Sequence, residues 1–66
     1  MSLHNKIEWL FPFDSMQAGD SFFIPSVKTA ELIFSIERGA KRSKVRVKTQ
    51  IVIEDDLMGV RTWRLD

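Results

Sequence analysis

Apolar and polar side chains alternate most regularly over residues 45–54. One side of the pattern holds Val45, Val47, Thr49, Ile51 and Ile53. The other side holds Arg46, Lys48, Gln50, Val52 and Glu54. An alternation of this length predicts a strand with one buried face and one solvated face.

This strand is expected to return through a hairpin. Residues 55–59 predict the loop, in which Gly59 is free to take a positive φ. Residues 60–65 predict the returning strand. Two facings of that strand remain open, with the inward pair being either Val60 and Thr62 or Trp63 and Leu65.

Residues 27–43 carry the pattern of a helix. A solvated stripe recurs at spacings of three and four positions and consists of Lys28, Glu31, Ser35, Arg38 and Arg42. The opposite side consists of Ala30, Ile33, Ile36 and Ala40, with Leu32 and Phe34 at its flanks. Ser26 is a natural N-cap, because its hydroxyl can accept a hydrogen bond from a free backbone N–H of the first turn.

Shorter elements precede the helix. An alternating, extended segment holds Ile7, Trp9, Phe11 and Phe13. Pro12 lacks a backbone donor, which confines this segment to an edge strand or an irregular arm. The remaining elements are one helical turn over 14–16, a turn over 17–20 and a short strand over 21–25.

The resulting order, β-α-β-β, predicts an α+β fold. We expect a small two-layer domain, in which an antiparallel sheet of three or four strands has one helix packed across it and is preceded by an extended aromatic N-terminal arm. A chain of 66 residues has room for one domain. We therefore expect a single domain over 1–66, with a flexible tail over 1–6.

Composition removes several classes of site. The chain has no Cys, and its single His, His4, lies in the expected tail, so we expect neither a metal nor a cofactor. Its three Gly residues are isolated and its Ser residues lack a nearby base, so we expect no enzymatic activity. No apolar run reaches the ~18 residues of a membrane span, so we expect no membrane partner and a cytoplasmic location.

The ten Lys and Arg residues are unevenly placed, although the net charge is only +1. Arg46 and Lys48 lie on the outward side of the long strand, and one facing of the returning strand adds an aromatic and a further cation. Such a surface predicts a platform for DNA or RNA, on which phosphates pair with cations and a base stacks on the ring. The candidates are Lys41, Arg42, Lys44, Arg46, Lys48, Arg61, Trp63 and Arg64. The alternative is a solvated face on which Trp63 covers the aliphatic stems of its neighbours.

The chain also has more large apolar side chains than one core of this size can hold. Phe22 and Phe23 are consecutive, so a strand must show one of them on each face. We therefore expect a homo-oligomer, with a symmetric dimer favoured. The protein-interface candidates are Trp9, Phe11, Phe13, Phe23 and Phe34. The aromatic arm has two further interpretations: it packs on its own sheet, or it docks on another protein.

Two separated motifs carry a resemblance. Residues 12–25 match an opening PF..M..GDSFF.P, which follows Phe11, and residues 59–64 match an ending G.R.WR. Together they resemble a group of small uncharacterised proteins from tailed bacteriophages. This chain departs from the group in having Thr62 where Val is common and in a longer acidic hairpin. The resemblance implies a phage or bacterial-cytoplasm setting, a small accessory or DNA-associated role, and surface roles for Arg61, Trp63 and Arg64.

These observations leave two hypotheses. The first is a non-enzymatic domain that binds nucleic acid through a basic hairpin and helix end. The second is a protein-interaction module, or a modulator of a host protein, that acts through the aromatic arm. If the domain binds nucleic acid through phosphate contacts, its affinity should fall strongly as the salt concentration rises. This dependence distinguishes the first hypothesis from the second.

Overall fold

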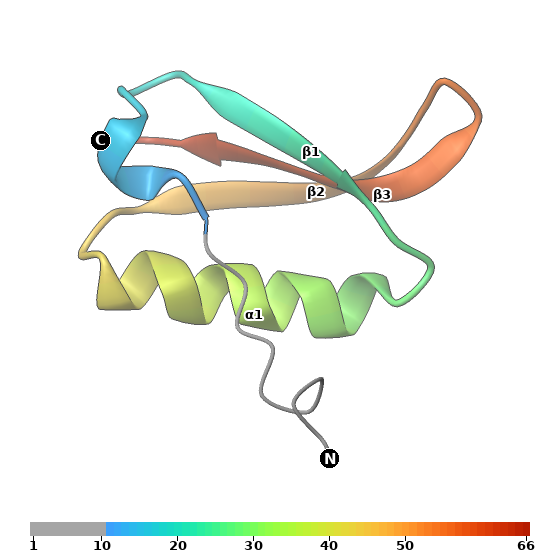
Figure 1. The fold of residues 1–66 in the computed structure, drawn as a ribbon, viewed down its shortest axis with the longest axis horizontal. Helices are drawn as coiled ribbons and strands as arrows, with labels where there is room; N and C mark the ends of the chain where they lie inside the picture. Colours follow the sequence, from blue (N-terminus) through green and yellow to red (C-terminus); the bar gives the residue numbers. More distant parts are fainter. Residues whose placement is uncertain (1–10) are drawn as a thin grey trace, which may run out of the picture.

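The computed structural model of this protein describes residues 11–66. It contains a 3-10 helix (Phe13–Ser15), strand β1 (Ser21–Pro25), helix α1 (Thr29–Arg42), strand β2 (Val47–Glu54) and strand β3 (Leu57–Arg64), as Figure 1 shows. This order is β-α-β-β, so the predicted α+β fold is confirmed. The expected tail and the interface candidate Trp9 lie outside the described residues.

The three strands form one antiparallel sheet in the order β1-β3-β2. In the central strand β3, Thr62 pairs with Phe22 of β1 and with Thr49 of β2. Trp63 pairs with Lys48 of β2. Because residues that are directly opposite share a face, Thr62 and its partners lie on one face while Trp63 and Lys48 lie on the other.

The hairpin between β2 and β3 is tighter than predicted. It consists of Asp55 and Asp56, which both have a positive φ, 52° and 64°. Two such residues in succession are typical of the type I′ turn, whose twist suits a two-residue hairpin, and Asp tolerates this conformation better than most residues. The loop predicted over 55–59 is therefore wrong, since β3 already begins at Leu57.

Gly59 lies within β3 and is not among the residues with a positive φ, which corrects its predicted role in the loop. Its importance lies in the space that it leaves for β1. A Cβ at this position would lie 2.7 Å from the Cα of Pro25 and closer still to the carbonyl oxygen of Ile24. The absence of a side chain therefore lets the two strands pair as far as Pro25.

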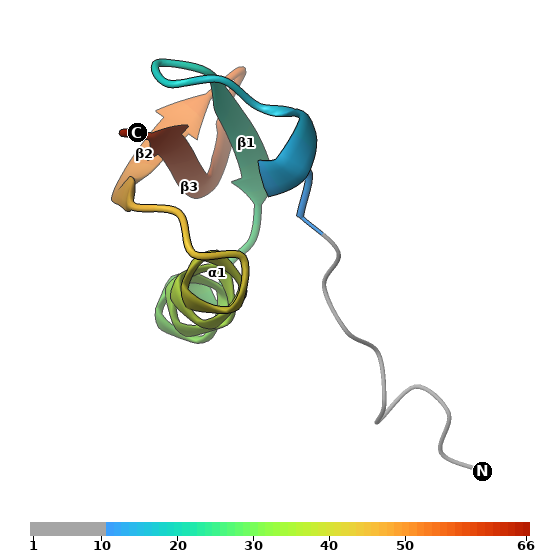
Figure 2. The ribbon, with the colours of Figure 1, turned by 90° about the vertical axis from the view of Figure 1, so that its left-hand side faces the viewer.

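Helix α1 crosses one face of the sheet and forms the second layer (Figure 2). The buried apolar side chains between the layers are Phe13, Leu32, Ile36, Ala40 and Val60. On the helix, the buried positions recur every four residues, which places them on one side of the helix. This corrects the predicted apolar side in two respects, because Leu32 is buried and Ala30 is exposed.

The start of α1 also differs from the prediction. The helix begins at Thr29 and ends at Arg42, inside the predicted range 27–43. The hydroxyl of Ser26 accepts a hydrogen bond from the backbone N–H of Lys28, at 3.0 Å. Ser26 therefore orders the approach to the helix, but Lys28 occupies the N-cap position.

The described part of the aromatic arm packs on its own domain. The ring centroids of Phe11 and Phe13 lie 5.6 Å apart, and that of Phe22 lies 5.8 and 6.0 Å from them. Gly39 on α1 leaves room for this cluster, because a Cβ there would lie 2.9 Å from Cδ2 of Phe11. The arm therefore closes the core beside β1.

The structure settles the facing of β3. Val60 and Thr62 are fully buried on the side of α1, whereas Trp63 lies on the opposite face. The hairpin reaches beyond the N-terminal end of α1 (Figure 1). As a result, Ile51 and Ile53 lie on the helix side of the sheet but remain exposed.

Candidate nucleic-acid interface

The face of the sheet that α1 leaves uncovered, called the open face below, holds the aromatic part of the predicted site. Trp63 of β3 and Lys48 of β2 are cross-strand neighbours there. The Nζ of Lys48 lies 5.9 Å from the centre of the Trp63 ring. Trp63 is half-buried and Lys48 is exposed. An accessible indole beside a cation is a combination that holds a stacked base next to a phosphate.

Arg61 lies on the same face but is bound within the domain. Its guanidinium donates to both carboxylate oxygens of Glu54, at 2.5 and 2.7 Å, and to the hydroxyl of Ser21, at 2.7 Å. It also lies over the ring of Phe23, at 5.8 Å. The hydrogen bond from Arg61 lowers the pKa of Glu54 below the usual 4.5. Arg61 therefore stabilises the open face and has little capacity left for a phosphate.

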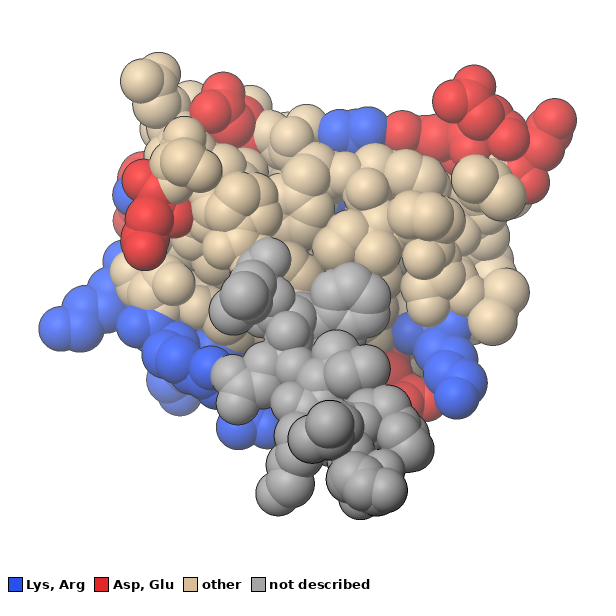
Figure 3. Space-filling model, viewed as in Figure 1, with Lys and Arg blue, Asp and Glu red and all other residues tan. Residues whose placement is uncertain are grey.

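The remaining cations gather where α1 ends and β2 begins. We call the exposed residues Lys41, Arg42, Lys44 and Arg46 the basic end. The only ion pair among residues 11–66 joins Arg61 to Glu54, so the side chains of these four cations form none there, although the backbone N–H of Arg46 donates to the carboxylate of Asp66, at 3.0 Å. Figure 3 shows the largest group of Lys and Arg at the lower left of the molecule, whereas Asp and Glu lie both at the upper right, on the side of the hairpin, and at the upper left, above the cations. The small net charge therefore conceals an uneven distribution of the cations.

The end of α1 fixes the backbone of the basic end. The N–H of Lys44 donates to the carbonyl of Lys41, at 3.1 Å, and the N–H of Val45 donates to that of Ala40, at 3.0 Å. This pair of bonds is the Schellman motif, which needs a left-handed residue and usually has Gly there. The position is occupied by Lys44, with φ 60°. The chain thus keeps a cation where glycine would be less strained.

Arg64 does not join the basic surface. Its guanidinium donates to the backbone carbonyls of Phe13, at 2.5 Å, of Met16, at 2.9 Å, and of Asp66, at 3.1 Å. It also lies on the opposite face of the sheet from Trp63, since the two are consecutive in β3. Of the eight sequence candidates, Arg61 and Arg64 are therefore engaged in the fold, and the other six are the four residues of the basic end together with the neighbouring pair Lys48 and Trp63.

The interface candidates among the aromatics are dispersed. Phe13 is 1% exposed and belongs to the core, and Phe11 packs against it. Phe23 lies on the open face beneath Arg61. Phe34 is 61% exposed on α1, with the guanidinium of Arg38 5.6 Å from its ring. They form no common docking surface, and the described part of the arm supports the interpretation that it packs on its own sheet.

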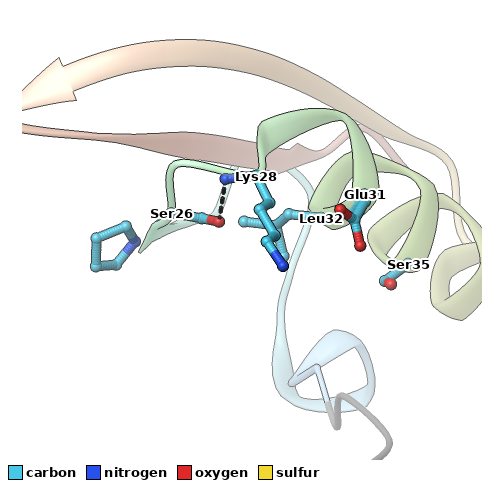
Figure 4. Close-up of a pocket in the computed structure, with 6 residues that line it drawn as sticks. Ser26, Lys28, Glu31, Leu32 and Ser35 are labelled. Carbon is cyan, nitrogen blue, oxygen red and sulfur yellow. Dashed lines mark hydrogen bonds between the residues drawn. The ribbon is translucent and has the colours of Figure 1, made fainter.

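A shallow hollow of about 190 Å³ lies at the start of α1 (Figure 4). Its lining consists of Pro25, Ser26, Lys28, Glu31, Leu32 and Ser35. The hydroxyl of Ser26 is already bonded to the backbone of Lys28. Neither Ser26 nor Ser35 is hydrogen-bonded to a side-chain base, so the lining shows no nucleophile–base pair.

Sequence reasoning missed two features of this surface. Glu54 was expected on the outward side of β2, but not as the partner of Arg61. The signal was present, since opposite charges on one face of a tight hairpin are close enough to pair. The left-handed Lys44 had no comparable signal, because Gly39 is the only glycine near the end of the helix and it lies within α1.

Among residues 11–66, no group of three or more His, Cys, Asp or Glu side chains is placed to hold a metal ion. No helix in this part of the chain is long and apolar enough to span a membrane. Comparisons of the chain with models of protein families, with curated proteins and with solved structures find no match.

Proposed function

We propose that this protein is a non-enzymatic domain that binds single-stranded nucleic acid through the basic end and Trp63. The proposal rests on one observation, namely that four exposed cations whose side chains form no ion pair in residues 11–66 lie at the same end of the sheet as the accessible indole of Trp63 and its neighbour Lys48. The resemblance to small tailed-phage proteins agrees with a DNA-associated accessory role in the cytoplasm of a bacterium or a phage-infected cell.

The geometry favours a single strand over a duplex. Phosphates would pair with the basic end, while a neighbouring base stacks on the ring of Trp63. That base takes the place of the Lys48 ammonium, which is then available for a phosphate. In a duplex the bases are already stacked on one another, so the indole would contribute little.

The acidic residues of the hairpin limit the site to one end of the molecule. Glu54, Asp55 and Asp56 lie at the opposite end of β2 from Arg46. Their charges repel a phosphate backbone, which would therefore pass the basic end and turn away from the hairpin. Binding through so few cations is expected to be weak at physiological salt and to strengthen at low salt.

A salt-dependent titration tests the proposal. Fluorescence anisotropy of labelled single-stranded DNA, single-stranded RNA and duplex DNA would be measured at several salt concentrations. Each phosphate contact with a single strand contributes about −0.7 to the slope of log affinity against log salt. Replacing Lys41 and Arg42 by Gln should therefore flatten the slope by roughly 1.4. Lys28→Gln, at the far end of α1, is the matched control and should leave it unchanged.

Lys44→Gly separates binding from folding. Glycine removes the conformational cost of the left-handed backbone at this position. The variant should therefore have a free energy of unfolding about 1 kcal/mol higher than that of the parent. Loss of the charge should nevertheless weaken binding and flatten the salt slope by roughly 0.7. A more stable protein that binds less well cannot be explained by damage to the fold.

Trp63→Leu tests the stacking contact. Losing a base–aromatic contact costs about 1–3 kcal/mol of binding, with little change in the salt slope. Binding of single strands should then fall toward that of duplex DNA. The proposal is rejected if the parent protein binds none of the three nucleic acids at low salt, or if Lys28→Gln weakens binding as much as the basic-end variants do.

A further inference from the structure

The free edge of β2 can be assigned from the backbone hydrogen bonds of β3. Arg64 exchanges hydrogen bonds with the β1 side, donating to the carbonyl of Asp20 at 2.9 Å and accepting from the N–H of Gly19 at 2.7 Å. Leu65 donates to the β2 side, to the carbonyl of Arg46 at 2.8 Å. Backbone groups alternate in direction along an antiparallel strand. The residues of β2 whose N–H and C=O groups point away from β3 are therefore Val47, Thr49, Ile51 and Ile53.

The two edges of the sheet differ in how open they are to another strand. β1 is short and ends in Pro25, which has no N–H to donate. β2 has eight residues, contains no proline and pairs with β3 without a bulge. Natural edge strands are usually shortened, bulged, covered or supplied with charged side chains, because an open edge is a template for pairing. Of these protections β2 has only the charges of Lys48 and Glu54, which are opposite in sign.

The same edge exposes apolar side chains. Ile51 is 50% exposed and Ile53 is 72% exposed, both on the helix side of the sheet and beyond the cover of α1. Met58, the cross-strand partner of Ile53, is 41% exposed. An apolar patch of this kind beside unpaired backbone groups is what a strand-pairing interface requires.

We propose that a second copy of this chain pairs with β2 in the antiparallel direction, with Ile51 at the two-fold axis. The charges of the strand select this partner and this direction. Pairing about Ile51 places Lys48 of each copy opposite Glu54 of the other, because the positions on either side of the axis are reversed. It also places Arg46 of each copy opposite Asp56 of the other. A parallel arrangement would place like charges together.

In the dimer, the edge of β2 that is unpaired in the single chain is paired with the same edge of the second copy. The three strands of each copy join into one six-stranded sheet, with both helices on the same face. The two Ile51 side chains meet at the axis, and each Thr49 lies across from an Ile53. Lys41, Arg42 and Lys44 remain outside this contact, so the dimer does not depend on nucleic-acid binding.

The mass in solution is the first test. Light scattering after size exclusion should give twice the 7.7 kDa of one chain. Ile53→Lys should give the mass of one chain with an unchanged circular dichroism spectrum, because the ammonium group would be buried in the contact. Val27→Lys, at a residue that is 82% exposed and away from the edge, is the matched control and should remain a dimer.

A cross-link tests the register, since the chain has no Cys of its own. In the proposed register the two Ile51 Cα atoms lie about 5.5 Å apart, within the range of a disulfide. Ile51→Cys should therefore form a covalent dimer on mild oxidation. Ile53→Cys should not, because its two copies are about 14 Å apart along the strand.

Several results would overturn the proposal. These are a mass of one chain for the parent protein at high concentration, an Ile53→Lys variant that stays dimeric, and cross-linking at Ile53→Cys equal to that at Ile51→Cys. Capture of an extended peptide by a monomeric parent would assign the edge to a different partner and would also overturn it. Ile51→Pro provides an independent check, because it removes an outward N–H without touching a β2–β3 hydrogen bond and should give monomers.

Discussion

The two faces of the sheet are held together by different interactions, although β3 contributes to both. On the helix side, Val60 and Thr62 are completely buried against α1. On the open face, Arg61 and Trp63 are partly exposed and are held by an ion pair and by cation–aromatic contacts. Successive residues of β3 therefore alternate between the apolar interior and a solvent-accessible surface.

This difference suggests a division of roles. Burial of apolar side chains on the helix side supplies most of the stability, because each buried side chain contributes far more than an exposed polar contact. The contacts of the open face can be exchanged at small cost, as binding requires. Substitutions on the helix side should therefore change stability, and those on the open face should change mainly recognition.

The largest expected effect is at the centre of the buried face. Ile36 is 0% exposed, and Ile36→Ala should lower the free energy of unfolding by about 3 kcal/mol through lost burial and a residual cavity. Urea denaturation followed by circular dichroism measures this change. Phe34→Ala on the exposed side of the same helix should cost less than about 1 kcal/mol. Equal losses at the two positions would contradict the division between the faces.

A smaller effect of opposite sign is expected at Thr62. Its side chain is fully buried, and its hydroxyl has no hydrogen-bond partner among residues 11–66. Thr62→Val keeps the shape and removes the unpaired polar group, so it should raise the free energy of unfolding by about 1 kcal/mol. Thr49→Val, at the paired and only half-buried position of β2, should change it less. A destabilised Thr62→Val protein would show that the hydroxyl is satisfied in solution.

The smallest effect concerns the ion pair of the open face. The pKa of Glu54 is lowered in the folded protein by the hydrogen bond from Arg61. A lowered pKa stabilises the fold at a pH above the usual value of 4.5, and this contribution is lost as the pH falls through the lowered pKa. The small stability advantage over Glu54→Gln should thus be constant at neutral pH and disappear in acid. Parallel urea titrations at several pH values measure it, and an advantage that persists in strong acid would exclude the ion pair as its source.

The sequence predicted the elements whose signal is local. The alternation over residues 45–54 identified β2 and its two faces, and Pro25 marked the end of β1. The roles of Gly59 and Gly39 were not predictable in the same way. Gly59 lies against β1 and Gly39 lies against Phe11, and both of these segments are distant in the sequence. The residues next to each glycine give no sign of this contact.

The sequence predicted most of the residues of the candidate site, but not the contacts that their side chains make. Six of the eight basic and aromatic candidates lie at one end of the molecule, which the strand and helix pattern had indicated. Arg61 and Arg64 were assigned to the surface because a sequence shows charge and not partners. Their hydrogen bonds to Glu54 and to the carbonyl of Phe13 depend on tertiary contacts that form only when the chain has folded.

The central position of β3 has a consequence for the synthesis of this protein. Both outer strands precede β3 in the chain and pair only with it. While residues 57–64 are still within the ribosome, β1 and β2 have no strand to bond, and α1 has no sheet to cover. The domain should therefore assemble after translation of its last strand, in a single step, instead of growing from its N-terminal end.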